Sequence, residues 1–174
     1  MGRLLVVVDM QNDFVDGALG FEDAGDVIDG IASRIREYKE AGDEVVYTLD
    51  THYENYSDTQ EGRNLPVPHC IKGTDGHKLV PALEELLKDC LCFEKPTFGS
   101  LKLANYINSN EDKYEVIEVC GLVSNICVIS NAIMAKAAAP EAEIIVDSAL
   151  TDSFDKELDA KTFDILRGVQ VTVR

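Results

Sequence analysis

The chain of 174 residues contains no tryptophan and few basic side chains: 16 lysines and arginines stand against 32 aspartates and glutamates, a formal net charge of −16. A basic stripe that would neutralise phosphates is therefore missing, and we expect no nucleic acid and no membrane surface as a partner. The apolar run near the start covers only residues 4–8, which is too short for a signal peptide or a membrane span. These features predict a soluble, cytoplasmic protein.

The sequence also lacks the motifs of several common site classes. No G-x-G-x-x-G follows the first apolar run and no P-loop occurs, so we expect neither a dinucleotide site nor a P-loop phosphate site. The five cysteines are odd in number and contain no C-x-x-C pair, which excludes a zinc ribbon and a thioredoxin-type redox pair. A free cysteine is most often a small buried apolar residue, and we expect this of Cys70, Cys90, Cys92 and Cys120.

Short apolar runs alternate with segments of helical spacing along the whole chain. Unbroken apolar runs are typical of strands buried on both faces, and strand–helix alternation is typical of a parallel sheet. The sequence therefore predicts a single α/β domain over residues 1–174, a three-layer α/β/α sandwich around a six-stranded, mostly parallel sheet. The expected strands are 4–8, 44–49, 90–94, 116–121, 143–146 and 169–173, and the expected helices are 26–41, 79–88, 100–108, 125–138 and 156–166.

Polar or reactive residues follow four of these strands. Asp9, Asp50 and Lys95 come at or directly after strand ends, and Gly121 ends a strand six residues before Cys127. A single aspartate there is most simply a turn or cap residue. Because parallel strands end at one edge of the sheet, four such positions together indicate a site at that edge.

Asp9, Lys95 and Cys127 have the chemistry of a thiol nucleophile with its supporting groups. A thiol is weakly nucleophilic at neutral pH until its proton is removed or its pKa is lowered. A carboxylate can act as the base, a lysine ammonium stabilises the thiolate, and a helix beginning near Cys127 would offer backbone N–H groups to an oxyanion. The trio predicts acyl transfer through a thioester.

A second group of polar residues lies in the long irregular segment 51–78. In an extended Asp50-Thr51-His52 segment, the carboxylate and the imidazole project to the same side and can meet one ion. Glu61 and His69 follow in the same loop, and two histidines with carboxylates suit zinc first, with iron or manganese as alternatives. Solvent-exposed polar loop residues are the competing interpretation, and we expect His77 to be exposed.

Five segments resemble the motifs of one family, in order and with its spacings from residue 4 to about 147. They are the D-x-Q-N-D-F motif of 9–14, the D-x-H of 50–52, the P-x-H-C-like segment 66–70, the lysine segment 93–96 and the nucleophile segment 121–128. With them the chain resembles the isochorismatase-like cysteine hydrolases and, among these, the nicotinamidase-type amidases.

The resemblance implies roles for the catalytic residues. Asp9 would be the general base, Cys127 the nucleophile, and Lys95 the group that stabilises the thiolate. A cis peptide bond between Leu122 and Val123 would free the Val123 N–H to form an oxyanion hole with the Cys127 N–H. The substrate pocket is expected to include Phe14 and Leu122.

The resemblance also implies a metal site, and with it an activity. Asp50, His52, Glu61 and His69 are the expected ligands. Many nicotinamidases have a further histidine at the position of Asp58, whereas other members use a glutamate at the position of Glu61, so we choose Glu61 over Asp58. Pro66 stands where relatives often place a tryptophan that stacks on the substrate ring. We expect hydrolysis of a small carboxamide, nicotinamide to nicotinate, by an enzyme that self-associates as a homo-oligomer. The alternatives are a metal-independent isochorismatase-like hydrolase, another amide or imide hydrolase, and a non-catalytic binding module on the same fold.

Overall fold

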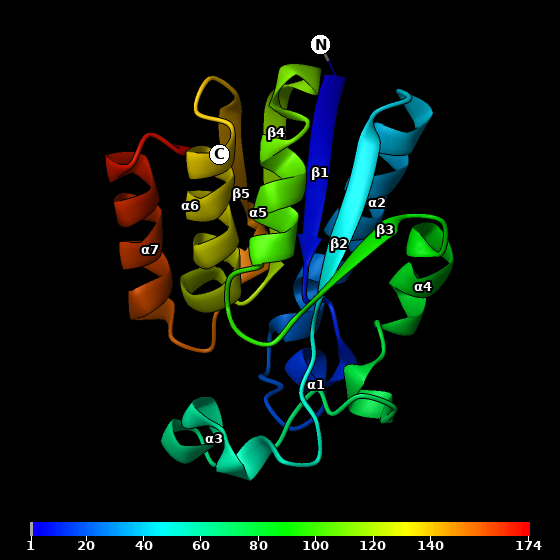
Figure 1. The fold of residues 1–174 in the computed structure, drawn as a ribbon, viewed down its shortest axis with the longest axis vertical. Coiled ribbons are helices and arrows are strands. Elements are labelled where there is room, and N and C mark those ends of the chain that lie inside the picture. Colours follow the sequence, from blue (N-terminus) through cyan, green and yellow to red (C-terminus); the bar gives the residue numbers. More distant parts are fainter. Residues whose placement is uncertain (1) are drawn as a thin grey trace.

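The computed structural model describes residues 2–174, and its centre is one six-stranded sheet with the strand order β3-β2-β1-β4-β5-β6 (Figure 1). All five pairings between neighbouring strands are parallel. The prediction of a three-layer α/β domain is confirmed, with an entirely parallel sheet. The strands are β1 (Gly2–Val8), β2 (Glu44–Asp50), β3 (Leu91–Lys95), β4 (Tyr114–Leu122), β5 (Glu143–Asp152) and β6 (Thr172–Val173).

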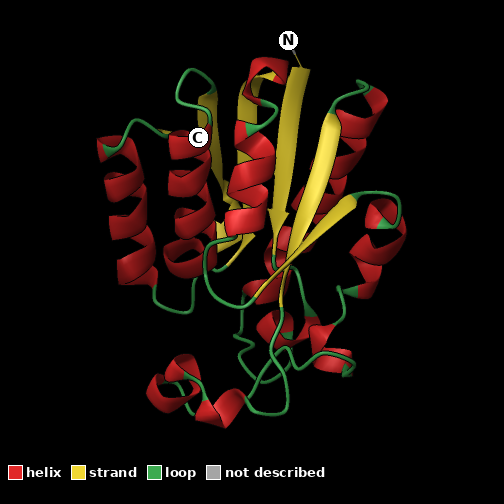
Figure 2. Cartoon of the chain, viewed as in Figure 1, coloured by secondary structure: helices red, strands yellow, loops and turns green. Residues whose placement is uncertain are grey.

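Helices cover both faces of the sheet, while two short helices lie beyond the carboxyl ends of the strands (Figure 2). One face carries α2 (Ile28–Glu40) and α4 (Pro81–Leu87). The other carries α5 (Leu101–Asn108), α6 (Ile129–Ala138) and α7 (Lys156–Gly168). The short helices are α1 (Asn12–Val15) and α3 (Gln60–Asn64); single 3₁₀ turns occupy Ala24–Val27, Tyr56–Asp58, Asp75–His77 and Glu111–Lys113, and Ser124–Val128 is a π-helical turn.

The central strand β1 explains why its sequence is apolar without interruption. Leu4, Val6 and Val8 face the core beneath α5, α6 and α7, whereas Leu5 and Val7 face the core beneath α2 and α4. All five side chains are fully buried. Since alternate residues of a strand point to opposite faces, a strand covered on both faces must be apolar at every position.

The last two strands, β5 and β6, have different boundaries from those that the sequence predicts. β5 continues to Asp152, because Thr151 and Asp152 pair with β4 after an irregularity in the register. β6 is only two residues long and pairs with β5 alone, so the apolar run that begins at Val169 mostly caps α7 and enters the core through Val171. A periodicity argument cannot distinguish such a buried connection from a strand.

The strand order places a crevice between β1 and β4. The connection from β1 leads outward to β2, and the connection from β4 leads outward to β5 on the other side. Parallel α/β sheets bind ligands at the carboxyl ends of strands where the order reverses in this way. Within residues 2–174, no helix combines the length and the apolar character that a membrane crossing requires.

Candidate active site

Three strands bring Asp9, Lys95 and Cys127 together at this crevice. The Nζ atom of Lys95 lies 2.5 Å from Oδ2 of Asp9 and 3.5 Å from Sγ of Cys127. The lysine also donates to the carbonyl oxygen of Thr97 at 3.0 Å. The second oxygen of Asp9 accepts a hydrogen bond from the hydroxyl of Thr48 at 2.6 Å. The chain therefore presents a carboxylate, an ammonium and a thiol in mutual contact, as expected from the sequence.

Burial controls the protonation of these groups. It raises the pKa of the Cys127 thiol well above its usual range, and Asp9 and Asp50 raise it further while Lys95 opposes them. Burial also raises the pKa of Asp9, against the opposing charge of Lys95. Burial alone would lower the pKa of Lys95, but Asp9 and Cys127 more than compensate and raise it. Burial thus favours the protonated form of the thiol, and its use as a nucleophile would require a base beside it.

The backbone around Cys127 has an unusual conformation. The Leu122–Val123 peptide bond is cis, as the resemblance implied, and the π-helical turn 124–128 follows it. Gly121 has φ +112°, and a Cβ atom on it would lie 2.1 Å from the carbonyl oxygen of Val8. Only glycine permits this close approach of β4 to β1, and the approach brings the Val123–Cys127 segment beside Asp9.

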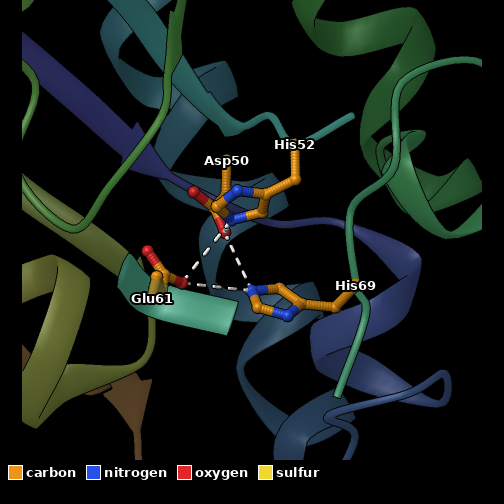
Figure 3. A group of neighbouring side chains, drawn as sticks. All are labelled: Asp50, His52, Glu61 and His69. Carbon is orange, nitrogen blue, oxygen red and sulfur yellow. Dashed lines mark hydrogen bonds and ion pairs between the residues drawn. The ribbon is translucent and has the colours of Figure 1, made fainter. Parts of the chain in front are cut away.

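The four expected metal ligands form one cluster (Figure 3). The cluster adjoins the trio, since Oδ1 of Asp50 lies 3.6 Å from Nζ of Lys95. The Nε2 atoms of His52 and His69 lie 3.0 and 3.2 Å from Oδ2 of Asp50. Oε1 of Glu61 lies 3.6 and 3.7 Å from the same two nitrogens. Each residue offers one donor atom, and these four atoms lie within 4.8 Å of one another, which is close enough for all of them to bind a single ion.

This donor set suits one divalent metal ion. Two imidazoles and two carboxylates are ligands that zinc, iron and manganese share, and all but Glu61 are buried. Burial opposes ionisation of Asp50, but hydrogen bonds with His52 and His69 lower its pKa. Burial and the nearby Asp50 raise the pKa of Glu61. A cation between the four side chains would offset the negative charge of the two carboxylates and would accept the lone pairs of the two imidazoles.

Residues outside the predicted site hold this cluster in place, and the D-x-Q-N-D-F motif supplies two of them. The buried side chain of Gln11 donates to the carbonyl oxygens of Asp50 and His77, both at 2.9 Å, and accepts from the Asp50 N–H at 2.8 Å. The carboxylate of Asp13 accepts from the N–H of Cys70 at 2.7 Å, next to His69. The motif indicated these residues, but sequence alone did not show what they bond to.

Two aromatic rings complete the packing around the metal ligands. The ring of Tyr56 lies 4.8 Å from that of His52 and 5.2 Å from that of His69, both in edge-to-face geometry. The Phe14 ring contacts His69 with a centroid distance of 5.7 Å. Tyr56 carried no signal in the sequence, since it lies in an irregular polar loop.

Cys127 of the trio and three residues of the metal cluster line one cavity of about 430 Å³. The lining includes Cys127 and Val123 together with the metal-cluster residues Asp50, Glu61 and His69. The remaining lining is mostly apolar: Phe14, Ala18, Leu19, Gly20, Leu65, Phe98, Ile126 and Phe154. The side chain of Leu122, expected in the pocket, instead packs in the core with α2 and α4 because β4 turns it away from the crevice.

The expectations for His77 and Cys92 are wrong, and the structure also places Asp58. His77 is buried rather than exposed, and its Nε2 lies 2.9 Å from the hydroxyl of Thr51. Cys92 is exposed rather than part of the core, because β3 is the edge strand. Asp58 is exposed and lies outside the metal cluster, which contains Glu61.

Comparisons with known proteins agree with this geometry. The family model "Isochorismatase domain" matches residues 3–174. The nicotinamidase/pyrazinamidase of Mycobacterium tuberculosis is 26% identical over 145 residues, which are 75% of this chain and 76% of that protein. The nicotinamidase/pyrazinamidase structure from Bacillus subtilis is 26% identical with a TM-score of 0.87, and 99% of each chain is covered. The pyrazinamidase of Pyrococcus horikoshii in complex with zinc has the same fold, at 24% identity and a TM-score of 0.85 over 100% of this chain and 99% of that one.

Proposed function

The chain belongs to the isochorismatase family, and from this premise we propose that it is a metal-dependent amidase that hydrolyses nicotinamide to nicotinate and ammonia. Two relatives at 26% identity, from Mycobacterium tuberculosis and Bacillus subtilis, are nicotinamidase/pyrazinamidases. Hydrolysis of an amide C–N bond is the activity that the trio of Asp9, Lys95 and Cys127 can perform.

One observation carries the proposal: the thiol of Cys127 and three residues of the metal cluster line the same, mostly apolar cavity. A flat ring can place a carboxamide at the thiol of Cys127 and, at the same time, a basic ring nitrogen at the metal cluster. The apolar side chains of Phe14 and Ile126 would contact the ring faces. Such a cavity, apolar with a few convergent polar groups, is typical of small-molecule sites.

The first half of the reaction forms a thioester. Asp9 takes the proton of Cys127, and the sulfur attacks the carbonyl carbon of the carboxamide. The N–H groups of Val123 and Cys127 stabilise the oxyanion of the tetrahedral intermediate. The proton then passes from Asp9 to the leaving nitrogen, the C–N bond breaks and ammonia departs. Lys95 stabilises the sulfur and carboxylate charges throughout, since it contacts both.

The second half of the reaction consumes one water molecule. Asp9, again ionised, takes a proton from this water molecule, and the oxygen of the water attacks the thioester carbonyl. The C–S bond breaks, the acid product forms, and the proton returns to the sulfur of Cys127. The net reaction is amide plus water to acid plus ammonia, with the enzyme restored.

Asp50, His52, Glu61 and His69 hold the metal ion in this proposal. When bound, the ion supplies a positive centre that attracts the ring nitrogen of the substrate, directly or through a water ligand. The four residues contribute by fixing the distance between that centre and Cys127. Zinc is the proposed ion, with iron and manganese as the alternatives.

The proposal is tested by measuring ammonia release from nicotinamide by the purified, zinc-loaded protein, with and without a chelator. Release that the chelator abolishes and added zinc restores supports the whole assignment. Release that is indifferent to complete metal removal refutes the metal's role and favours a metal-independent hydrolase. A folded, metal-loaded protein that releases nothing from nicotinamide is then given a panel of other amides and imides. Inertness toward all of them, with Cys127 unreactive to iodoacetamide, would favour the binding module.

A further inference from the structure

Three large apolar side chains line the cavity and are at the same time exposed to solvent. Leu65, Phe98 and Phe154 are 37%, 46% and 60% exposed, although all three line the cavity. They therefore surround its mouth. Each comes from a different segment: Leu65 follows α3, Phe98 lies between β3 and α5, and Phe154 lies between β5 and α7. We call these three residues the apolar rim.

Buried polar side chains hold the backbone of the apolar rim. The hydroxyl of Tyr56 donates to the carbonyl oxygen of Leu65 at 2.9 Å. The amide of Asn131, itself buried, donates to the carbonyl oxygens of Phe98 at 3.1 Å and of Cys127 at 2.8 Å. The loop that carries Phe98 is thereby connected directly to the nucleophile segment.

The third rim residue is held through its neighbours. The fully buried Ser153 donates through its hydroxyl to Oδ1 of Asn125 at 2.7 Å and accepts from the N–H of Asp155 at 3.0 Å. The Phe154 ring rests edge-on against Phe21, with a centroid distance of 6.3 Å. The apolar rim is thus a preformed surface, not a set of loose side chains.

The cavity has more room than one ring needs, and its lining carries no positive side chain. A pyridine carboxamide has nine non-hydrogen atoms, whereas cavities of roughly 300–1,000 Å³ are typical of much larger, drug-sized ligands. Among the described residues 2–174, no lysine or arginine lines this cavity. Lys156, over the Phe21 ring, is ion-paired with Asp152 at 2.7 Å and with Asp23 at 3.4 Å.

We propose that the apolar rim is an outer substrate subsite, so that the enzyme prefers aromatic carboxamides carrying a neutral apolar substituent over both the bare ring and anionic analogues. This inference rests on the proposed carboxamide hydrolysis, because it places the carboxamide at Cys127 and the substituent at the mouth. Large apolar side chains exposed together around a cavity are stabilised when a ligand covers them. An anionic substituent would meet no lysine or arginine among the residues that line the cavity and would face a strongly acidic protein.

The test compares three classes of ligand on the zinc-loaded protein: nicotinamide, nicotinamide with a phenyl group at ring carbon 5 or 6, and the two phenyl compounds with a carboxylate on the phenyl group. Binding is measured by calorimetry on the Cys127→Ala protein, and kcat/KM on the wild type. We expect at least one neutral phenyl compound to bind about tenfold more tightly than nicotinamide, and its carboxylate to lose that gain.

Variants identify where the gain arises. Phe98→Ala and Phe154→Ala should each reduce the ratio of phenyl-substituted to bare-ring affinity toward one. Ile165→Ala is the matched control, since Ile165 is 54% exposed on α7 and does not line the cavity. It should leave the ratio unchanged.

The outcomes separate this inference from the proposed function. Hydrolysis of nicotinamide with no gain from any neutral substituent overturns the outer subsite and leaves the function standing. Hydrolysis of a phenyl compound but not of nicotinamide overturns the nicotinamide assignment and supports the subsite. If Phe98→Ala or Phe154→Ala instead splits a solution oligomer in sedimentation experiments without changing the ratio, the rim is an interface between copies and the inference is wrong.

Discussion

The ammonium of Lys95 lies 2.5 Å from a carboxylate oxygen of Asp9, although the two side chains are only 1% and 0% exposed. Taking both charges out of water costs several kcal/mol per ion, and a close contact between them offsets this cost. Replacing either residue alone therefore leaves the other buried charge without its nearest partner. Stability and, in the proposed mechanism, catalysis depend on the same pair.

Asp9→Asn tests both consequences. We expect the free energy of unfolding to fall by about 3–5 kcal/mol because Lys95 loses its main partner, and turnover to fall by about 10²–10⁴-fold because the base is lost. Urea unfolding and ammonia release measure the two effects. The double variant Asp9→Asn/Lys95→Met removes the unpaired charge, so it should regain stability without regaining activity. Recovery of turnover in the double variant would contradict the role of Asp9.

Cys127→Ala should abolish turnover while leaving the fold intact, because the thiol forms the covalent bond and alanine fits the same space. Cys92→Ala is the control, since Cys92 is exposed on the edge strand and does not line the cavity. Iodoacetamide labelling followed by peptide mass analysis adds a second measure: nicotinamide should protect Cys127 and not Cys92. Equal protection of both, or activity in Cys127→Ala, would rule out Cys127 as the nucleophile.

His52→Ala should reduce bound metal to well below one ion per chain, because it removes one of four clustered donors. Elemental analysis after dialysis gives the metal content, and the rise in Tm on adding zinc gives an independent reading, since a ligand that binds only the folded state stabilises it. Asp58→Asn should retain the metal because Asp58 lies outside the cluster. Loss of metal in Asp58→Asn but not in His52→Ala would require a different ligand set.

Gln11→Ala should weaken metal binding although Gln11 is not a ligand. Its side chain makes three buried hydrogen bonds, two of them to the backbone of Asp50. Losing such a supporting residue typically costs 10–100-fold in metal affinity, which competition with a chelating dye measures. The neighbouring Asn12→Ala is the control, since Asn12 makes one exposed hydrogen bond to Asp75. Equal affinities in the two variants would show that Asp50 is held without Gln11.

Gly121→Ala should destabilise the fold by more than about 1 kcal/mol, because the residue has φ +112° and its added Cβ would clash with the Val8 carbonyl. The clash would also move Asp9 away from Cys127, so turnover should fall even under conditions in which the variant stays folded. Gly168→Ala is the matched control, since a Cβ at Gly168 meets nothing within 4 Å. It should stay within about 1 kcal/mol of the wild type in thermal unfolding.

Some expectations failed because they depended on contacts between distant segments. His77 sits in a polar, glycine-containing stretch that looks exposed, yet Gln11 and Thr51 pack around it and bury it. Leu122 follows the pattern of a pocket residue by its position beside Val123, but the direction of its side chain depends on how β4 ends. Cys92 looked like a core residue, and only the position of β3 at the sheet edge exposes it.

The sequence by itself determined the architecture and the chemistry of the site, because these are recorded locally. Unbroken apolar runs require a sheet covered on both faces, and the residues that follow those runs must meet at one edge of a parallel sheet. Tertiary structure alone decided what these residues do to one another. The hydrogen bonds of Gln11 to Asp50, the burial of His77 against Thr51 and the apolar rim of the cavity each join segments tens of residues apart, and local patterns contain no information about such distances.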